Sequence, residues 1–303
     1  MKKDFLSIAD LNSDEVWDLL RSAKEMKEKV KGGTSYTPLV GQTLAMIFQK
    51  PSLRTRVSFE VGMHQLGGSA VYLSPQEIRI GERESTADVA RVISRYCDGI
   101  MARLFAHADM LELGQYASVP VINGLDDLLH PCQVMGDILT VWEHRDTLDD
   151  LKVAWVGDGN NVANSWITLC SKLPMTLHLA VPDRYEPNGE ILKAAQAAGL
   201  SEVRVVHSPK EAVTDADVIY TDVWASMGQE AERDERARAF RDFQVNEQLV
   251  GLARDDVKVM HCLPAHRGDE ITSDVMDGPR SIVFDQAENR LHIQKAIMAA
   301  LMG

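Results

Sequence analysis

The chain has 303 residues, a formal net charge of −13 and an apolar content of 45%. This length accommodates two domains of ordinary size, each with its own core. The acidic balance argues against a nucleic acid or an anionic membrane as partner. No apolar stretch reaches the roughly 20 residues that a membrane-spanning helix needs. None of the four cysteines forms a CxxC pair, which indicates free thiols and a cytoplasmic location.

The first predicted element is a helix over about residues 13–30, with Asn12 as N-cap and Glu15 at the capping-box position. Ten short strand-like segments follow, with helical segments between them. They are 43–48, 70–73, 99–104, 119–122, 152–156, 177–181, 203–206, 218–221, 258–262 and 281–284. Several are apolar without alternation, which is typical of strands covered on both faces. The pattern predicts an α/β protein with two parallel sheets.

A polar stretch at 144–150 separates a helix from the next strand and marks the predicted domain boundary. The charge-dense segment 229–242 is interpreted as a solvated helix face. The last segment, 289–302, has an amphipathic pattern and is predicted to be a helix that docks on another part of the chain.

The sequence SLRTR begins where the strand 43–48 ends and a helix starts at Pro51-Ser52. The free backbone N–H groups of a first helical turn, the hydroxyls of Ser52 and Thr55 and the guanidinium of Arg54 would form a phosphate site without a Gly-rich loop. The alternative is a capped helix with exposed arginines. Arg54 and Arg56 lie on different sides of a helix, so we expect Arg56 to be structural.

The sequence HPCQ places His130 directly before Pro131, at a predicted helix start. The positive helix end would lower the His130 pKa and favour a neutral imidazole that donates one N–H to a carbonyl or phosphoryl oxygen. Gln133 offers both a donor and an acceptor. A structural histidine is the alternative.

The sequence GDGNNV after the strand 152–156 is superficially similar to a dinucleotide-binding turn. The third glycine is missing, because Val162 stands there, although Asp183 lies near the distance expected for a ribose-binding acid. This leaves NAD binding as an alternative. The amides of Asn160 and Asn161 could instead contact an amino-acid ligand.

Two further strands end in polar residues. Asp222 follows the strand 218–221, and a carboxylate there, with Ser226 close by, would suit an ammonium group, or would cap a helix. Cys262 ends the strand 258–262. A zinc site with His261 is disfavoured, because adjacent strand residues are expected to point to opposite faces. A Cys–His nucleophile pair stays open.

Arg290 begins the last helix, where a surface arginine is the simplest interpretation.

Together and in this order, the segments resemble the aspartate/ornithine carbamoyltransferase family along nearly the whole chain. SLRTR is similar to the Ser-x-Arg-Thr-Arg motif of that family, and HPCQ to its His-Pro-x-Gln motif. GDGNNVANS, DVWASMGQE and HCLPAHRG resemble the ornithine branch, whereas the aspartate branch typically has a His-Pro-Leu-Pro-type segment at the last position.

The resemblance implies three parts: a carbamoyl-phosphate domain at 1–145, an ornithine domain at 146–285 and a helix at 286–303 that returns to the first domain. It implies a carbamoyl-phosphate site of Ser52, Leu53, Arg54, Thr55, Arg103, His130, Gln133, Cys262, Leu263 and Arg290. It implies that Asn161, Asp222, Ser226 and Met227 hold ornithine. Arg79 stands where the family often has Gln or His, in a loop that usually comes from a neighbouring subunit, and it is expected to contact phosphate.

The implied reaction transfers the carbamoyl group of carbamoyl phosphate to the δ-amine of L-ornithine, giving L-citrulline and phosphate, without metal or cofactor. Thr55, Arg103 and His130 would polarise the carbonyl oxygen. Cys262 is the fourth expected catalytic residue. Cys262 and Asp222 would orient or deprotonate the amine, and the leaving phosphate is an alternative base. The resemblance also implies a homotrimer or an assembly of trimers.

Three alternatives remain from the sequence. One is a carbamoyltransferase for another amine, such as putrescine, a modified ornithine or aspartate. The second is an NAD-dependent oxidoreductase, which the missing third glycine opposes. The third is a catalytically silent subunit, which would predict damage to SLRTR, HPCQ or HCLP, and all three are intact.

Overall fold

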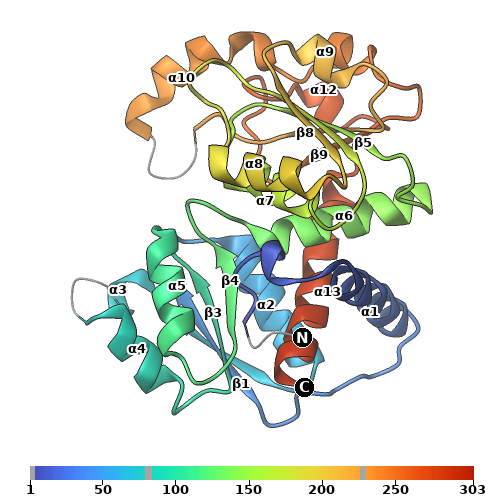
Figure 1. Cartoon of the computed structure of the whole chain (residues 1–303). Helices are drawn as coiled ribbons and strands as arrows, with labels where there is room; N and C mark the ends of the chain where they lie inside the picture. The colour runs from blue at the N-terminus through green and yellow to red at the C-terminus, as the bar shows by residue number, and fades with distance from the viewer. Residues whose placement is uncertain (1–3, 79–83, 226–229) are drawn as a thin grey trace. The chain divides into compact units, whose positions relative to one another are not determined.

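The structure is a computed structural model that describes residues 4–78, 84–225 and 230–303. It consists of two compact units, Met1–Leu139 with Glu288–Gly303, and Thr140–Ala287. Each unit is built on its own parallel sheet (Figure 1). Two helices, α6 (Pro131–Arg145) and α13 (Val283–Met302), run from one unit into the other.

The first unit contains a four-stranded parallel sheet in the order β2-β1-β3-β4. The strands are β1 (Thr43–Phe48), β2 (Ser69–Leu73), β3 (Gly99–Arg103) and β4 (Val121–Leu125). The helices are α1 (Ser13–Lys31), α2 (Leu53–Gln65), α3 (Pro75–Ile78), α4 (Thr86–Ile93) and α5 (His107–Tyr116), after a short 3₁₀ segment, Ile8–Asp10. In Figure 1, α3, α4 and α5 lie on one side of this sheet, and α1, α2 and α13 lie on the other.

The register of this sheet brings three strand ends to one edge. Phe48 of β1 pairs with Arg103 of β3, and Arg103 pairs with Leu125 of β4. SLRTR follows β1 and HPCQ follows β4, so both motifs begin at this edge with Arg103 between them. The carboxyl ends of parallel strands are where α/β sheets place their ligands.

The second unit contains a five-stranded parallel sheet in the order β7-β6-β5-β8-β9. The strands are β5 (Lys152–Val156), β6 (Thr176–Ala180), β7 (Glu202–Val206), β8 (Val218–Thr221) and β9 (Lys258–His261). The helices are α7 (Asn161–Leu169), α8 (Gly189–Ala198), α9 (Pro209–Val213), α10 (Arg233–Ala239), α11 (Glu247–Val250) and α12 (Ser273–Met276), with 3₁₀ segments at Glu230–Glu232 and Arg241–Phe243. Val156, Thr221 and His261 pair across this sheet and end three neighbouring strands together.

Most sequence predictions are confirmed. The first helix is Ser13–Lys31, and Asn12 and Glu15 form the predicted capping box. Nine of the ten predicted strands are present. Four of them end elsewhere than expected. β3 stops at Arg103, β4 starts after Pro120 and continues to Leu125, β6 stops at Ala180, and β9 stops at His261.

The prediction of a strand at 281–284 is wrong. Ser281 makes only an isolated bridge to Val259, and α13 begins at Val283. Ile282 and Val283 are buried, so their apolar character reflects packing rather than strand pairing. The terminal helix is therefore six residues longer at its start than the predicted 289–302.

The terminal helix packs on helices of the first unit, as expected. Lys27 of α1 donates to Asn289 Oδ1 at 2.7 Å, and Lys295 donates to Gln65 Oε1 of α2 at 2.9 Å. Among the described residues, no helix combines the length and the apolar content needed to span a bilayer.

Candidate active site

The segment SLRTR starts α2 with its hydroxyls close together. Ser52 is the N-cap, and its Oγ accepts from the Thr55 N–H at 3.3 Å and lies 3.1 Å from Thr55 Oγ1. Thr55 is fully buried and accepts a hydrogen bond from Arg290 Nη2 at 2.8 Å. Leu53 is exposed. The first turn of α2 carries no acidic side chain, which leaves the positive helix end available to an anion.

The two arginines of this segment differ as expected. Arg54 is half-buried, and its Nε is buried without a hydrogen-bond partner among the described residues. Arg56 is exposed, lies 4.0 Å from the centre of the Tyr72 ring and has its Nε 3.5 Å from Glu60 Oε2. A buried guanidinium N–H without a partner is costly unless a ligand supplies an acceptor.

His130 lies at the start of α6 and is 5% exposed. Burial lowers its pKa well below the usual range, and the charges of Arg290, Arg103 and Arg54 lower it further. The pKa of His130 shifts in the predicted direction, with desolvation as the largest cause and three guanidinium charges after it. The imidazole is therefore neutral at pH 7, and one ring nitrogen carries a proton that it can donate.

Gln133 and Cys132 follow on the same helix. Gln133 is 1% exposed, donates to Asp137 Oδ1 at 2.8 Å and has a buried Oε1 without a hydrogen-bond partner in the described parts of the chain. Cys132 donates to the Asn123 carbonyl at 3.3 Å, and burial raises its pKa to about 12. A thiol with this pKa does not act as a nucleophile at pH 7.

The strand ends of the second sheet bring Asp222 and Cys262 together. Asp222 is 5% exposed, and its Oδ1 accepts from the Cys262 thiol at 2.9 Å and from the Val223 N–H at 2.8 Å. Its Oδ2 accepts from Asn160 Nδ2 at 2.7 Å. Asn160 is also the N-cap of α7, with its Oδ1 accepting from two backbone N–H groups. The Asn160 amide therefore orients Asp222, and Asn161 is the first residue of α7.

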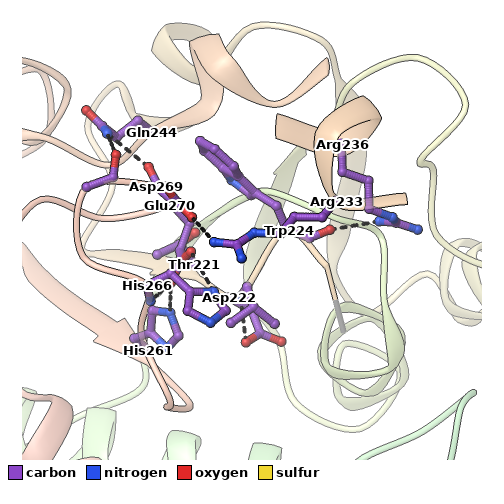
Figure 2. A network of polar contacts seen from close by, with 12 residues as sticks. Thr221, Asp222, Trp224, Arg233, Arg236, Gln244, His261, His266, Asp269 and Glu270 are labelled. Carbon is purple, nitrogen blue, oxygen red and sulfur yellow. Dashed lines mark hydrogen bonds and ion pairs between the residues drawn. The ribbon is translucent and has the colours of Figure 1, made fainter. Parts of the chain in front are cut away.

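His261 and Glu270 hold the turn after β9 (Figure 2). His261 Nδ1 accepts from the Leu263 N–H at 2.9 Å, and Nε2 lies 3.0 Å from Glu270 Oε1. Glu270 is fully buried and also accepts from the His266 N–H at 2.5 Å. Leu263 has a left-handed φ of 58°, a conformation that its hydrogen bond to His261 helps to hold.

The expectation that His261 and Cys262 point to opposite faces is wrong. Strand β9 ends at His261, so alternation no longer applies to Cys262, and ligand atoms of Asp222, His261 and Cys262 lie within 4.8 Å of one another. However, both ring nitrogens of His261 already have partners. A metal at this position would have to displace Leu263 or Glu270 from His261.

One charged residue of the segment 229–242 is not solvated as predicted. Arg236 of α10 is 6% exposed and donates to Asp158 Oδ2 at 3.0 Å. It also donates to the Trp224 carbonyl at 2.9 Å (Figure 2). Burial raises the pKa of Asp158 to about 6, although the Arg236 charge opposes the shift. The sequence does not reveal this pair, because nothing in a charge-dense run distinguishes one buried arginine from its exposed neighbours.

The two units divide the predicted site residues between them. The first holds Ser52, Leu53, Arg54, Thr55, Arg103, His130, Gln133 and Arg290, and the second holds Asn161, Asp222, Cys262 and Leu263. Arg79, Ser226 and Met227 lie outside the described residues.

Residues 3–143 match the carbamoyl-P binding domain of aspartate/ornithine carbamoyltransferase, and residues 149–301 match the Asp/Orn binding domain. The chain belongs to the aspartate/ornithine carbamoyltransferase family. Within this family it is 53% identical over 302 residues to the ornithine carbamoyltransferase of Syntrophus aciditrophicus, with 100% of both chains covered. It is also 53% identical over 306 residues to the anabolic ornithine carbamoyltransferase of Pyrococcus furiosus, covering 99% of this chain and 96% of that protein.

Solved structures of family members agree with the fold. The Pyrococcus furiosus ornithine carbamoyltransferase has a TM-score of 0.95 at 52% identity, covering 99% of this chain and 97% of that chain. The Thermus thermophilus ornithine carbamoyltransferase has a TM-score of 0.91 at 43% identity, with 100% of both chains covered.

Proposed function

We propose that this protein transfers the carbamoyl group of carbamoyl phosphate to the δ-amine of L-ornithine, giving L-citrulline and phosphate. The observation that carries the proposal is a neutral, buried His130 close to Arg54, Arg103 and Arg290 at the edge of the first sheet. Full-length relatives named ornithine carbamoyltransferase at 53% identity support it.

The first unit supplies the carbamoyl-phosphate half of the proposed site. The phosphate is held by Ser52, Arg54, Thr55 and the backbone of this turn, including the Leu53 N–H, which suits a helix start with arginine donors. Arg103 and Arg290 neutralise the leaving phosphate. His130 and Thr55 donate toward the carbonyl oxygen as it gains negative charge, and Gln133 binds the carbamoyl end. The family resemblance also assigns Cys262 and Leu263 of the second unit to carbamoyl phosphate.

The second unit supplies the ornithine half. The carboxylate of Asp222 is ordered by three donors and suits an ammonium group. Asn161, Ser226 and Met227 complete this half in the proposal. The nucleophile is the free amine, so Cys262 and Asp222 orient it or take its proton, or the leaving phosphate takes that proton.

Chemically, the δ-nitrogen forms a bond to the carbamoyl carbon and gives a tetrahedral intermediate. This intermediate collapses with cleavage of the bond between that carbon and the bridging oxygen, and the electron pair leaves with phosphate. Holding the amine against the carbamoyl carbon and stabilising the oxyanion account for the rate enhancement. No step needs a covalent enzyme intermediate, a metal or a cofactor.

The proposal includes a homotrimer, or an assembly of trimers, in which Arg79 of a neighbouring copy contacts the phosphate. A mass close to three times the 33.6 kDa chain, by light scattering, would support it. We further propose a cytoplasmic location, which the free cysteines Cys97, Cys132, Cys170 and Cys262 favour. The anabolic relative from Pyrococcus furiosus favours operation in the direction of citrulline synthesis.

The decisive experiment is to mix the purified protein with carbamoyl phosphate and L-ornithine and to measure citrulline. We expect citrulline and phosphate in equal amounts. A panel with putrescine, N-acetylornithine and aspartate in place of ornithine tests the acceptor, and we expect ornithine to be preferred. Folded protein that forms no citrulline above the blank would contradict the proposal.

A further inference from the structure

We propose that Asp126 and His107 are positioning residues for His130, an inference that rests on the proposed function. In this view the carboxylate of Asp126, oriented by the imidazole of His107, holds the turn that presents His130 to the carbamoyl group. Neither residue belongs to the segments SLRTR, HPCQ, GDGNNVANS, DVWASMGQE or HCLPAHRG.

Asp126 bonds across the turn between β4 and α6 with both its side chain and its backbone. Its side chain is fully buried, and Oδ1 accepts from the Leu128 N–H at 2.9 Å and from the Leu129 N–H at 2.7 Å. Its own backbone N–H donates to the Leu129 carbonyl at 2.9 Å. His130 is the next residue after Leu129, so the geometry of this turn sets where the His130 backbone begins.

The second oxygen of Asp126 is held by two side chains. Oδ2 accepts from Asn123 Nδ2 at 2.8 Å and lies 2.7 Å from His107 Nδ1. A carboxylate oxygen accepts, so His107 Nδ1 carries the proton in this bond. The same bond is the largest cause of the raised pKa of His107. Four donors therefore fix the rotation of one buried carboxylate.

His107 and Asn123 connect this carboxylate to different elements. Asn123 is a fully buried residue of β4, and its side chain also donates to the Leu6 carbonyl at 2.9 Å. His107 is the first residue of α5 and is half-buried. Removing His107 leaves the backbone bonds to Oδ1 and the Asn123 bond to Oδ2 in place. It removes one of the four donors that orient the carboxylate, which should shift the turn without unfolding it.

His130 is the group that such a shift would affect. Its carbonyl accepts from the Gln133 N–H at 3.1 Å and the Val134 N–H at 3.3 Å, so it is part of the first turn of α6. A misplacement of a reacting group by about 1 Å can cost about 10²-fold in rate. The phosphate contacts, in contrast, are assigned to the turn after β1 and to Arg103 and Arg290, and none of the four donors to Asp126 belongs to that set.

The test compares His107→Leu with His107→Asn, whose side-chain amide can replace the Nδ1–H donor. Steady-state kinetics would give kcat/KM for carbamoyl phosphate, KM for ornithine and the inhibition constant of inorganic phosphate. For His107→Leu we expect kcat/KM for carbamoyl phosphate to fall about tenfold, with the other two constants within about twofold. His107→Asn should recover most of the loss, because it restores the donor.

A matched control is His144→Leu, which removes another His–Asp pair. His144 Nε2 lies 2.9 Å from Asp285 Oδ2, and neither residue belongs to the proposed site. We expect its kinetics to match those of the wild-type protein. Equal losses for carbamoyl phosphate and inorganic phosphate in His107→Leu, no loss at all, or no recovery in His107→Asn would overturn the proposal.

If His107→Leu does not fold, Asp126→Asn takes its place, since one amide oxygen can still accept from Leu128 and Leu129. The same selective loss is expected, and a uniform loss would count against positioning. Wild-type protein that makes no citrulline would refute the proposed function instead. The positioning role would then be judged by calorimetric binding of carbamoyl phosphate against inorganic phosphate, where the variant must weaken only the former.

Discussion

At the scale of single residues, the chemistry depends on how burial acts on one imidazole and on several guanidinium groups. His130 is neutral because it is desolvated and surrounded by positive charge, whereas the nearby arginines stay charged at any physiological pH. A neutral imidazole donates to a carbonyl oxygen without adding a further cation to the site. Arg54 and Arg56 also differ in burial. They are two residues apart on α2, so Arg54 is half-buried, whereas Arg56 is exposed and lies over the Tyr72 ring.

Arg54→Ala tests this difference at the residue scale. We expect kcat/KM for carbamoyl phosphate to fall by about 10²–10³, because a charge-stabilising donor is lost, with the circular dichroism spectrum unchanged. Arg56→Ala is the matched control and should stay within about threefold, because Arg56 is exposed. Equal kinetics in the two variants would remove Arg54 from the phosphate site.

At the scale of secondary-structure elements, helix starts position the site. Ser52 caps α2, Asn160 caps α7, and both helices begin within five residues of a strand end. The cap residues satisfy first-turn N–H groups and leave others directed at the strand edge. Helix α10 has a different role, because its buried Arg236 joins the turn at Asp158 to the backbone at Trp224.

Arg236→Met tests the docking of α10. We expect the free energy of unfolding, from urea denaturation at pH 7, to fall by about 3–5 kcal/mol, because Asp158 is left buried without its cation. Arg238→Met, on the exposed side of the same helix, should change it by less than about 0.5 kcal/mol. Similar losses in both variants would show that the buried pair does not hold the helix.

At the scale of the whole molecule, the chain folds as two parallel-sheet units that share α6 and α13. The long terminal helix carries a buried polar group into its contact with α1. His292 is 3% exposed, and burial lowers its pKa to about 4. Asp158 shifts in the opposite direction, to about 6, so pH acts on the stability of this protein through at least two opposed groups.

The pH dependence of stability that His292 causes follows from proton linkage. Its folded pKa lies below the ordinary value of 6.5, so the unfolded chain binds the proton more tightly. The stability it provides is complete above about pH 6.5 and is lost as pH falls toward 4. Replacing His292 with Gln should therefore reduce the loss of stability between pH 6.5 and 4 by about 1–3 kcal/mol.

Urea denaturation at several pH values measures this difference, with His64→Gln as an exposed control on α2. The control should retain the pH dependence of the wild-type protein. If His292→Gln loses stability with acid as steeply as the wild-type protein, then His292 does not remain neutral in the folded chain.

The sequence by itself determined the parallel α/β class, nine of the ten expected strands and the motifs that mark the family. These are local properties, since apolar runs, caps and motif spacing are written in consecutive residues. The same reasoning failed at 281–284, because an apolar run buried by packing has the composition of a strand.

Only the tertiary structure decided which polar residues share a space. The sequence distinguished neither Arg236 from its charged neighbours nor Asp126 from Asp127, and it could not bring Arg290 to Thr55 across 235 positions of the chain. Their partners come from distant segments, and burial is a property of the folded chain. The pKa of His130 has the same origin, because desolvation and three arginines exist around it only after folding.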